Sequence, residues 1–260
     1  MESAEYHQAL AALQWQIDLG ADEALQEKPV NRYDVPAAVA KPAKAATPAA
    51  PAMVGTQAPA AVDAVAAAEA AAAATTTLEE LRAAMAGFEH CELKRGARNL
   101  VFSDGIAGAP VMLIGEAPGR DEDREGRPFV GRAGQLLDKM LEAIDRGRTR
   151  RDAPVYITNV LPWRPPQNRD PKPEEIAMMR PFLLRHIALA DPQVLVIVGN
   201  WSAQALLGKR GITRLRGQWT QAADRPALPM FHPAYLLRSP EFKREAWADL
   251  LSLKTRLRDG

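Results

Sequence analysis

The chain has 260 residues, 47% of them hydrophobic, and its 33 Lys and Arg nearly balance its 32 Asp and Glu, for a net charge of +1. This size allows one or two domains, and the single cysteine, Cys91, excludes both an intramolecular disulfide and a metal site built only from one chain's cysteines. Because no apolar run predicts a transmembrane helix and the first residues do not resemble a signal peptide, we expect a protein of the cytoplasm.

The N-terminal third differs in composition from the rest. Residues 1–90 hold 5 Lys and Arg against 12 Asp and Glu, whereas residues 91–260 hold 28 against 20. Apolar residues at helical spacing predict a short helix within residues 1–27, and the Ala/Pro-rich composition of residues 28–77 predicts a disordered linker. The basic excess of the remaining globular domain, 78–260, suggests a polyanionic partner, although an ordinary solvated surface fits the same count.

Within 78–260, short apolar runs alternate with amphipathic segments. After a helix at 78–87, strands are predicted at 110–114, 155–158, 193–198 and 229–231, and helices at 134–144, 173–190, 202–207 and 240–258. This alternation favours an α/β fold, a doubly wound, mostly parallel sheet with helices on both faces. Loops at the carboxyl ends of its strands would meet at one edge, so residues far apart in sequence can share one pocket.

The loop after the first of these strands is rich in glycine and proline. It reads Gly-Glu-Ala-Pro-Gly at 115–119 and Gly-Arg-Pro-Phe-Val-Gly at 126–131. Glu116 would stand at the sheet edge, and Phe129 would precede a helix, where its ring could stack on a planar ligand. A solvated turn glutamate and an ordinary core phenylalanine explain the same residues when each motif is taken alone.

The loop after the second strand begins with Asn159 and continues as Arg-Pro-Pro-Gln-Asn-Arg at 164–169. A carboxamide at a strand end offers the donor and the acceptor needed to read an amide or imide edge. A stiff loop with an arginine at each end suits a phosphate backbone. A turn-capping asparagine and a proline-stiffened surface loop are the alternatives.

The third loop, His-Pro-Ala-Tyr-Leu-Leu-Arg at 232–238, follows the strand at 229–231. His232 is placed as a donor to a group bound at the sheet edge. Leu236 and Leu237 beside Arg238 are either a wedge that enters a base stack or buried residues in the first turn of a local helix. No set of His, Cys and carboxylate residues has metal-ligand spacing, so no metal site is expected.

Together the three segments resemble family 4 uracil-DNA glycosylases over about residues 78–258, and three motifs in order make the resemblance specific. It implies a three-layer α/β/α sandwich with a mostly parallel central sheet. It also implies a base-excision-repair hydrolase that cleaves the N-glycosidic bond of deoxyuridine in DNA. We expect a monomer that works near the nucleoid. Because the motifs contain no lysine nucleophile, we expect no lyase adduct.

The resemblance also implies the residues that carry the reaction. Glu116 and Asn168 would place or activate the attacking water. His232 would donate to uracil O2 while negative charge builds on the departing base. A carboxylate next to the cationic sugar would favour the same transition state.

Binding roles follow in the same way. Phe129 would stack on the flipped uracil, Asn159 would bind its Watson–Crick edge and reject cytosine, and Glu122 would crowd the C5 position and disfavour thymine. The residues implied for DNA contact are Arg164, Arg169, Leu236, Leu237 and Arg238.

The iron–sulfur ligands of the family are the main departure. Family members hold a four-iron cluster on four cysteines, and the corresponding residues here are Phe88, Cys91, Trp163 and Met179. Bulky apolar side chains replace three of the four ligands, so we expect no cluster and a hydrophobic plug in its place. Cys91 is expected to remain as a buried thiol.

The loop at 160–173 is short and lacks the histidine-bearing insert with which some relatives crosslink to the abasic product, so turnover is expected.

Other interpretations of the sequence stay open. A degenerate relative that binds uracil or damaged DNA without cutting is the main alternative, and a small-ligand-binding domain unrelated to DNA is another. The N-terminal helix could recruit a protein partner through the linker.

Overall fold

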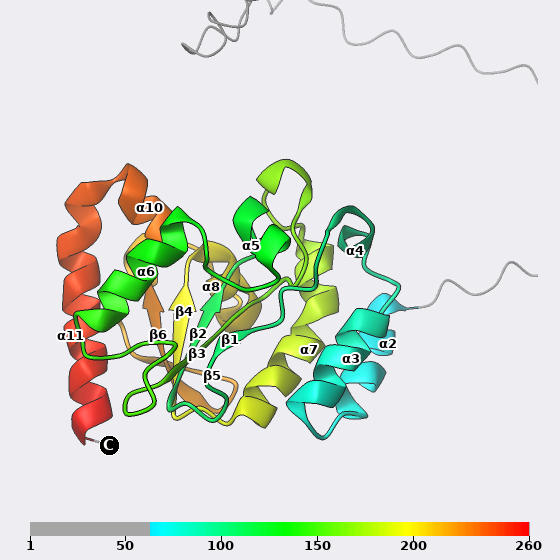
Figure 1. The fold of residues 1–260 in the computed structure, drawn as a ribbon, viewed down its shortest axis with the longest axis horizontal. Coiled ribbons are helices and arrows are strands. Elements are labelled where there is room, and N and C mark those ends of the chain that lie inside the picture. The colour runs from blue at the N-terminus through cyan, green and yellow to red at the C-terminus, as the bar shows by residue number, and fades with distance from the viewer. Residues whose placement is uncertain (1–62, 260) are drawn as a thin grey trace, which may run out of the picture. The chain divides into compact units, whose positions relative to one another are not determined.

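A computed structural model describes residues 63–259 (Figure 1). The helix expected within 1–27, the linker up to residue 62 and any partner contact made by these segments lie outside the described residues. Figure 1 shows a central sheet with helices on both of its faces. Within the described part, no helix combines the length and the apolar character needed to cross a membrane.

The sheet has six strands in the order β1-β3-β2-β4-β6-β5. Its centre is parallel and consists of β3 (Val155–Asn159), β2 (Val111–Gly115), β4 (Val194–Val198) and β6 (Arg225–Met230). The antiparallel edge strands, β1 (Asp104–Gly105) and β5 (Thr220–Ala222), were not predicted, because strands of two or three residues carry no periodicity. The expected mostly parallel sheet is confirmed.

Alternate side chains of β2 enter cores on opposite faces of the sheet, as the period of a strand requires. Met112 and Ile114 pack with residues of α7 (Pro173–Ala190) and α8 (Asn200–Leu207). Val111 and Leu113 pack with residues of α6 (Arg132–Glu142) and α11 (Lys243–Asp259). These three layers are the α/β/α sandwich that the sequence predicted.

The first two helices of the described part pack near α7. The first turn of α3 (Leu78–Gly87) is capped by Thr77, whose Oγ1 accepts from the Glu80 N–H at 3.1 Å. The sequence prediction places α2 (Ala64–Ala73) in the linker, and this is corrected: its Ala68 is fully buried, and Arg185 of α7 donates to the Thr75 carbonyl. Alanine favours helix and permits close packing, so the folded part extends back at least to residue 63.

Short helical segments fill the connections. They are α4 (Leu93–Gly96), α5 (Arg120–Glu125), η1 (Pro166–Asn168), α9 (Ile212–Leu215), α10 (Pro233–Arg238) and η2 (Pro240–Phe242). In Figure 1, α5 and α10 lie at the end of the sheet toward which the arrows of β2 and β4 point. The carboxyl ends of the parallel strands therefore carry the loops that hold the three sequence motifs.

Candidate active site at the carboxyl edge of the sheet

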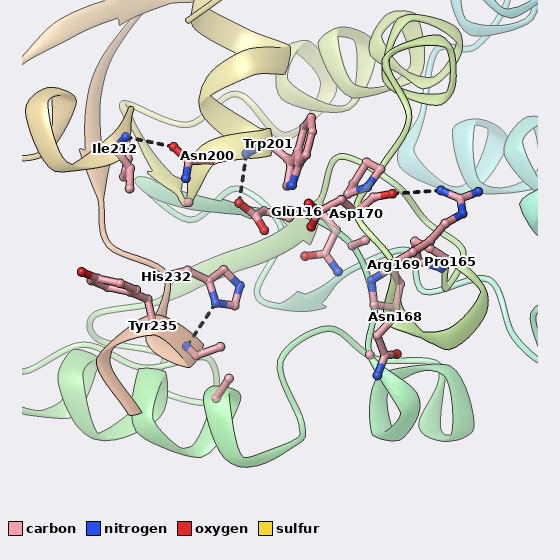
Figure 2. A pocket seen from close by; sticks show the side chains of 18 of the residues that line it. Glu116, Pro165, Asn168, Arg169, Asp170, Asn200, Trp201, Ile212, His232 and Tyr235 are labelled. Carbon is pink, nitrogen blue, oxygen red and sulfur yellow. Dashed lines mark hydrogen bonds between the residues drawn. The ribbon is translucent and has the colours of Figure 1, made fainter. Parts of the chain in front are cut away.

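A cleft of about 640 Å³ opens at this edge, and all three motifs contribute to its lining (Figure 2). The lining comes from the loops after β2 and β3, the start of α8, and the loop from β6 into α10. Among the residues singled out in the sequence, those that line it are Glu116, Glu122, Phe129, Asn159, Asn168, Arg169, His232 and Arg238. The expected convergence of three distant turns is thus present.

Phe129 lies next to both Asn159 and His232 in the lining of the cleft. A Cβ added to Gly115 would overlap Asn159 Oδ1 and lie 2.6 Å from Cζ of the Phe129 ring. The Phe129 and His232 rings are stacked, with centroids 5.5 Å apart and an interplanar angle of 27°. Glycine at the end of β2 therefore leaves the space that lets the Phe129 ring and the Asn159 carboxamide meet.

The backbone of Phe129 lies in the left-handed region, with φ +54°. This conformation costs a non-glycine residue about 1–2 kcal/mol. Arg148 compensates by donating to the carbonyls of Phe129 (2.9 Å) and Pro128 (3.1 Å). Its guanidinium is fixed by Asp104 and Asp138, each at 2.8 Å. Sequence reasoning missed Arg148, because it lies outside every motif and only the fold brings it to this loop.

Glu122 organises the same loop. Its Oε1 accepts from the backbone N–H groups of Val130 and Gly131, each at 2.9 Å, and its Oε2 accepts from the Gly119 N–H at 3.1 Å. Both carboxylate oxygens are thus engaged by backbone donors that join the two glycine-rich segments. This observed role differs from the expected contact with C5 of a pyrimidine, which stays a prediction.

Glu116 lies between Trp201 and His232 in Figure 2. Its Oε1 accepts from the Trp201 N–H, in the first turn of α8, at 2.9 Å. Burial raises the pKa of this carboxyl, Asp170 adds to the rise, and the backbone donors of α8 oppose it. Gly199 makes this close approach possible: its φ is +100°, and an added Cβ would overlap Oε1 and lie 2.8 Å from Cδ of Glu116.

His232 precedes α10 and caps its first turn. Its Nδ1 accepts from the Ala234 N–H at 3.1 Å, a bond drawn in Figure 2. Burial lowers the pKa of His232 to about 4, and the Arg238 charge adds to the effect. The ring is therefore neutral at neutral pH, and because Nδ1 accepts, its proton is assigned to Nε2. His232 thus offers one uncharged N–H donor.

The second motif is held by its own arginines. Arg164 Nε donates to Asn168 Oδ1 at 2.8 Å, and Arg169 pairs with Glu175 at the start of α7. Gln167 and Asn168 both have φ +55°. Arg169 lines the cleft while paired with a carboxylate, whereas Arg164 does not line the cleft. Of the two arginines expected to contact phosphate, Arg169 therefore lies at the cleft but is already paired, and Arg164 lies outside the cleft lining.

The leucine pair of the third motif divides between core and surface. Leu236 is only 1% exposed and packs with Ile212, Phe231 and Ala246, whereas Leu237 is 37% exposed. Successive residues of α10 point about 100° apart, so one leucine enters the core while its neighbour faces solvent. The expected wedge role of Leu236 is corrected to a core role, and Leu237 is the accessible leucine.

Comparison with known proteins shows the family of this chain. The model of the Uracil DNA glycosylase superfamily matches residues 102–251, the region that carries all three motifs. The chain belongs to this superfamily. It is 40% identical over 172 residues to a Type-4 uracil-DNA glycosylase of Thermotoga maritima, covering 64% of this chain and 86% of that one. It is 37% identical over 184 residues to a Type-4 uracil-DNA glycosylase of Archaeoglobus fulgidus, covering 66% and 89%.

The four residues expected, from the resemblance, to replace cluster cysteines lie in one hydrophobic core. Phe88, Cys91, Trp163 and Met179 are each at most 5% exposed. Phe88 packs edge-on against Phe182, with ring centroids 5.2 Å apart. Burial raises the pKa of the Cys91 thiol, which disfavours the thiolate that binds iron. One thiol among apolar side chains does not fit a cluster that needs four thiolates.

Sequence reasoning missed further residues of the cleft, notably Trp201 and Arg210. Neither belongs to a motif, and both become neighbours of Glu116 only because α8 begins at the end of β4. A tryptophan three residues after the predicted strand at 193–198 was a usable signal, since such positions face the carboxyl edge of the sheet.

Proposed function

We propose that this protein hydrolyses the N-glycosidic bond of deoxyuridine in DNA, releasing uracil and leaving an abasic site. The observation that carries the proposal is the convergence of Glu116, Phe129, Asn159 and His232 on one cleft. The relatives named Type-4 uracil-DNA glycosylase, matched over most of their length, support the same reaction.

Recognition requires a base that has left the helix. A glycosylase extrudes its target nucleotide at a cost of a few kcal/mol and reads the flipped base in a pocket. Stacking on Phe129 returns about 1–3 kcal/mol. The Asn159 carboxamide accepts from uracil N3–H and donates to O4. Cytosine presents the reverse pattern at these two positions, so it leaves both polar groups of Asn159 unpaired.

Bond breaking separates charge. The bond from C1′ to N1 breaks with its electron pair on the base, so the sugar becomes cationic and uracil O2 gains negative charge. The Nε2–H of neutral His232 donates to O2 as this charge develops, which stabilises the transition state more than the ground state. A neutral donor keeps its proton, so uracil leaves as an anion.

Water completes the reaction at C1′. The Glu116 carboxylate is anchored through Oε1 to α8. Its negative charge stabilises the cationic sugar, and it orients the water whose oxygen bonds to C1′. The released proton passes to Glu116 or to solvent. Asn168 is the second group proposed to position this water. No lysine of the motifs is available to form a covalent adduct, so the enzyme is monofunctional and turns over.

The proposal also covers the residues that contact DNA and the cofactor content of the enzyme. Arg164, Arg169 and Arg238 would contact phosphates, and Leu237 would fill the gap left by the flipped nucleotide. We also propose that the enzyme acts as a cytoplasmic monomer and works without an iron–sulfur cluster. Iron analysis and a visible absorption spectrum of anaerobically purified protein test the last point. Stoichiometric iron with cluster absorbance would contradict it.

The deciding experiment uses a labelled duplex with one U:G pair. Wild-type protein should leave an alkali-labile abasic site, His232→Ala should lose most of this activity, and Trp247→Ala, on the exposed face of α11, should keep it. Equal binding of the duplex by wild type and His232→Ala, without any cleavage, would instead identify a uracil-binding module. Absence of both cleavage and binding would refute any role on DNA.

A further inference from the structure

Trp201 and Arg210 stand at the border between the cleft and a second hollow. This hollow, about 690 Å³, lies between α7 and α8. In the described part of the chain, Trp201 and Arg210 are the two residues that line both spaces. Figure 2 draws the Trp201 side chain among the residues that line the cleft. The second hollow therefore borders the candidate active site at this pair.

The pair has the chemistry of a nucleotide platform. The Arg210 guanidinium carbon lies 4.0 Å from the centroid of the Trp201 ring, in cation–π contact. Within residues 63–259, Arg210 forms no ion pair. Its charge opposes the rise in the pKa of Glu116, although the two groups do not lie within ion-pair distance. Its planar group can both stack with a base and donate to a phosphate.

The charge of the second hollow favours the same ligand. Its lining contains Arg180 and Arg210 and no carboxylate, and the apolar remainder includes Ile176 and Leu207. A DNA strand that places deoxyuridine in the cleft must continue past the rim, because each nucleotide is joined to the next through phosphate. The rim that carries an aromatic ring and an unpaired cation is the path that matches this polyanion.

We propose that Trp201 and Arg210 bind the nucleotide that adjoins the everted deoxyuridine in the damaged strand. The base of this nucleotide stacks on the indole–guanidinium pair, its phosphate accepts from Arg210, and the strand continues along the hollow between α7 and α8. A base held there has left its own duplex stack. The platform therefore favours single-stranded or locally opened DNA over intact duplex. This inference rests on the proposed glycosylase function.

The test measures kcat/KM on single-stranded oligonucleotides with one uracil. Matched substrates carry a base-less tetrahydrofuran nucleotide on one side of the uracil or on the other. On the full substrate, Trp201→Ala should lower kcat/KM about 5- to 150-fold, equivalent to about 1–3 kcal/mol, while Trp201→Phe keeps most activity. The loss should be smaller on a duplex. Arg210→Ala should also reduce the slope of log(kcat/KM) against log[salt] by about 1.

The base-less substrates separate platform from scaffold. On one of them, wild type should fall to the level of Trp201→Ala, and the variant should lose nothing further. Trp247→Ala, an exposed tryptophan of α11, is the matched control and should behave as wild type throughout. An undiminished effect of Trp201→Ala on both base-less substrates would mean that the Trp201 side chain only maintains the shape of the cleft, and would overturn the inference. The inference would also be overturned if Trp201→Ala had no effect on any substrate. An inactive wild type would refute the glycosylase function itself.

Discussion

Gly199→Ala should disable the site through a single methyl group. The new Cβ would overlap Oε1 of Glu116 and lie 2.8 Å from its Cδ, where an ordinary contact needs at least 3.4 Å. The carboxylate must therefore move by roughly 1 Å, which breaks its 2.9 Å bond to the Trp201 N–H. Displacement of a reacting group by about 1 Å can cost about 100-fold in rate. We expect a loss of that order in kcat.

Backbone strain must be separated from this displacement. Gly199 has φ +100° and ψ −177°, a region open essentially to glycine alone, so the variant should also lose about 1–3 kcal/mol of unfolding free energy. Gly108→Ala is the matched control, because Gly108 has φ +77° and nothing lies within 4 Å of the added Cβ. It should lose stability by backbone strain alone and keep its kcat.

The assay is single-turnover cleavage of uracil-containing DNA, at a temperature where thermal melting shows both variants folded. Each kcal/mol of lost stability should lower Tm by about 2–4 °C for a domain of this size. If Gly199→Ala cleaves as fast as Gly108→Ala, the Glu116 carboxylate is not the group that the reaction needs, and the mechanism proposed here is wrong.

Three further predictions concern other parts of the site and the core. Burial raises the pKa of Glu116, and its carboxylate is the active form. As the pH decreases, kcat/KM should therefore begin to fall above the pH range in which glutamate usually titrates. Glu116→Gln should abolish this pH dependence. Arg148→Ala frees the Phe129 loop and should raise KM about 10-fold, with partial rescue by added guanidinium but not by Arg148→Lys; unchanged KM contradicts the clamp. Burial lowers the pKa of His186 to about 3, below its unfolded value of about 6.5. The unfolded state then binds more protons, so Tm should drop as pH falls from about 6.5 toward 3. His186→Gln should flatten this dependence, and an unchanged dependence would contradict the prediction.

The helices and strands could be predicted from the sequence because their apolar residues repeat with the period of a helix or of a strand. The apolar run at 193–198 became β4, and the bounds 173–190 of the long helix were predicted to the residue. The three motifs were readable because glycine, proline and histidine follow predicted strands, and parallel strands bring their carboxyl ends to one edge. The family, the sandwich and the cleft therefore follow from local sequence.

The tertiary structure decided which atoms each side chain meets. Arg148, Gly199 and Trp201 support or border the site only because loops, strand ends and helix ends converge there, and a one-dimensional pattern does not encode such contacts. For the same reason Glu122 emerged as a loop anchor and Leu236 as a core residue. The fate of a polar or apolar group in a loop depends on burial and partners from distant segments, whereas that of a strand or helix residue depends mainly on its neighbours in the chain.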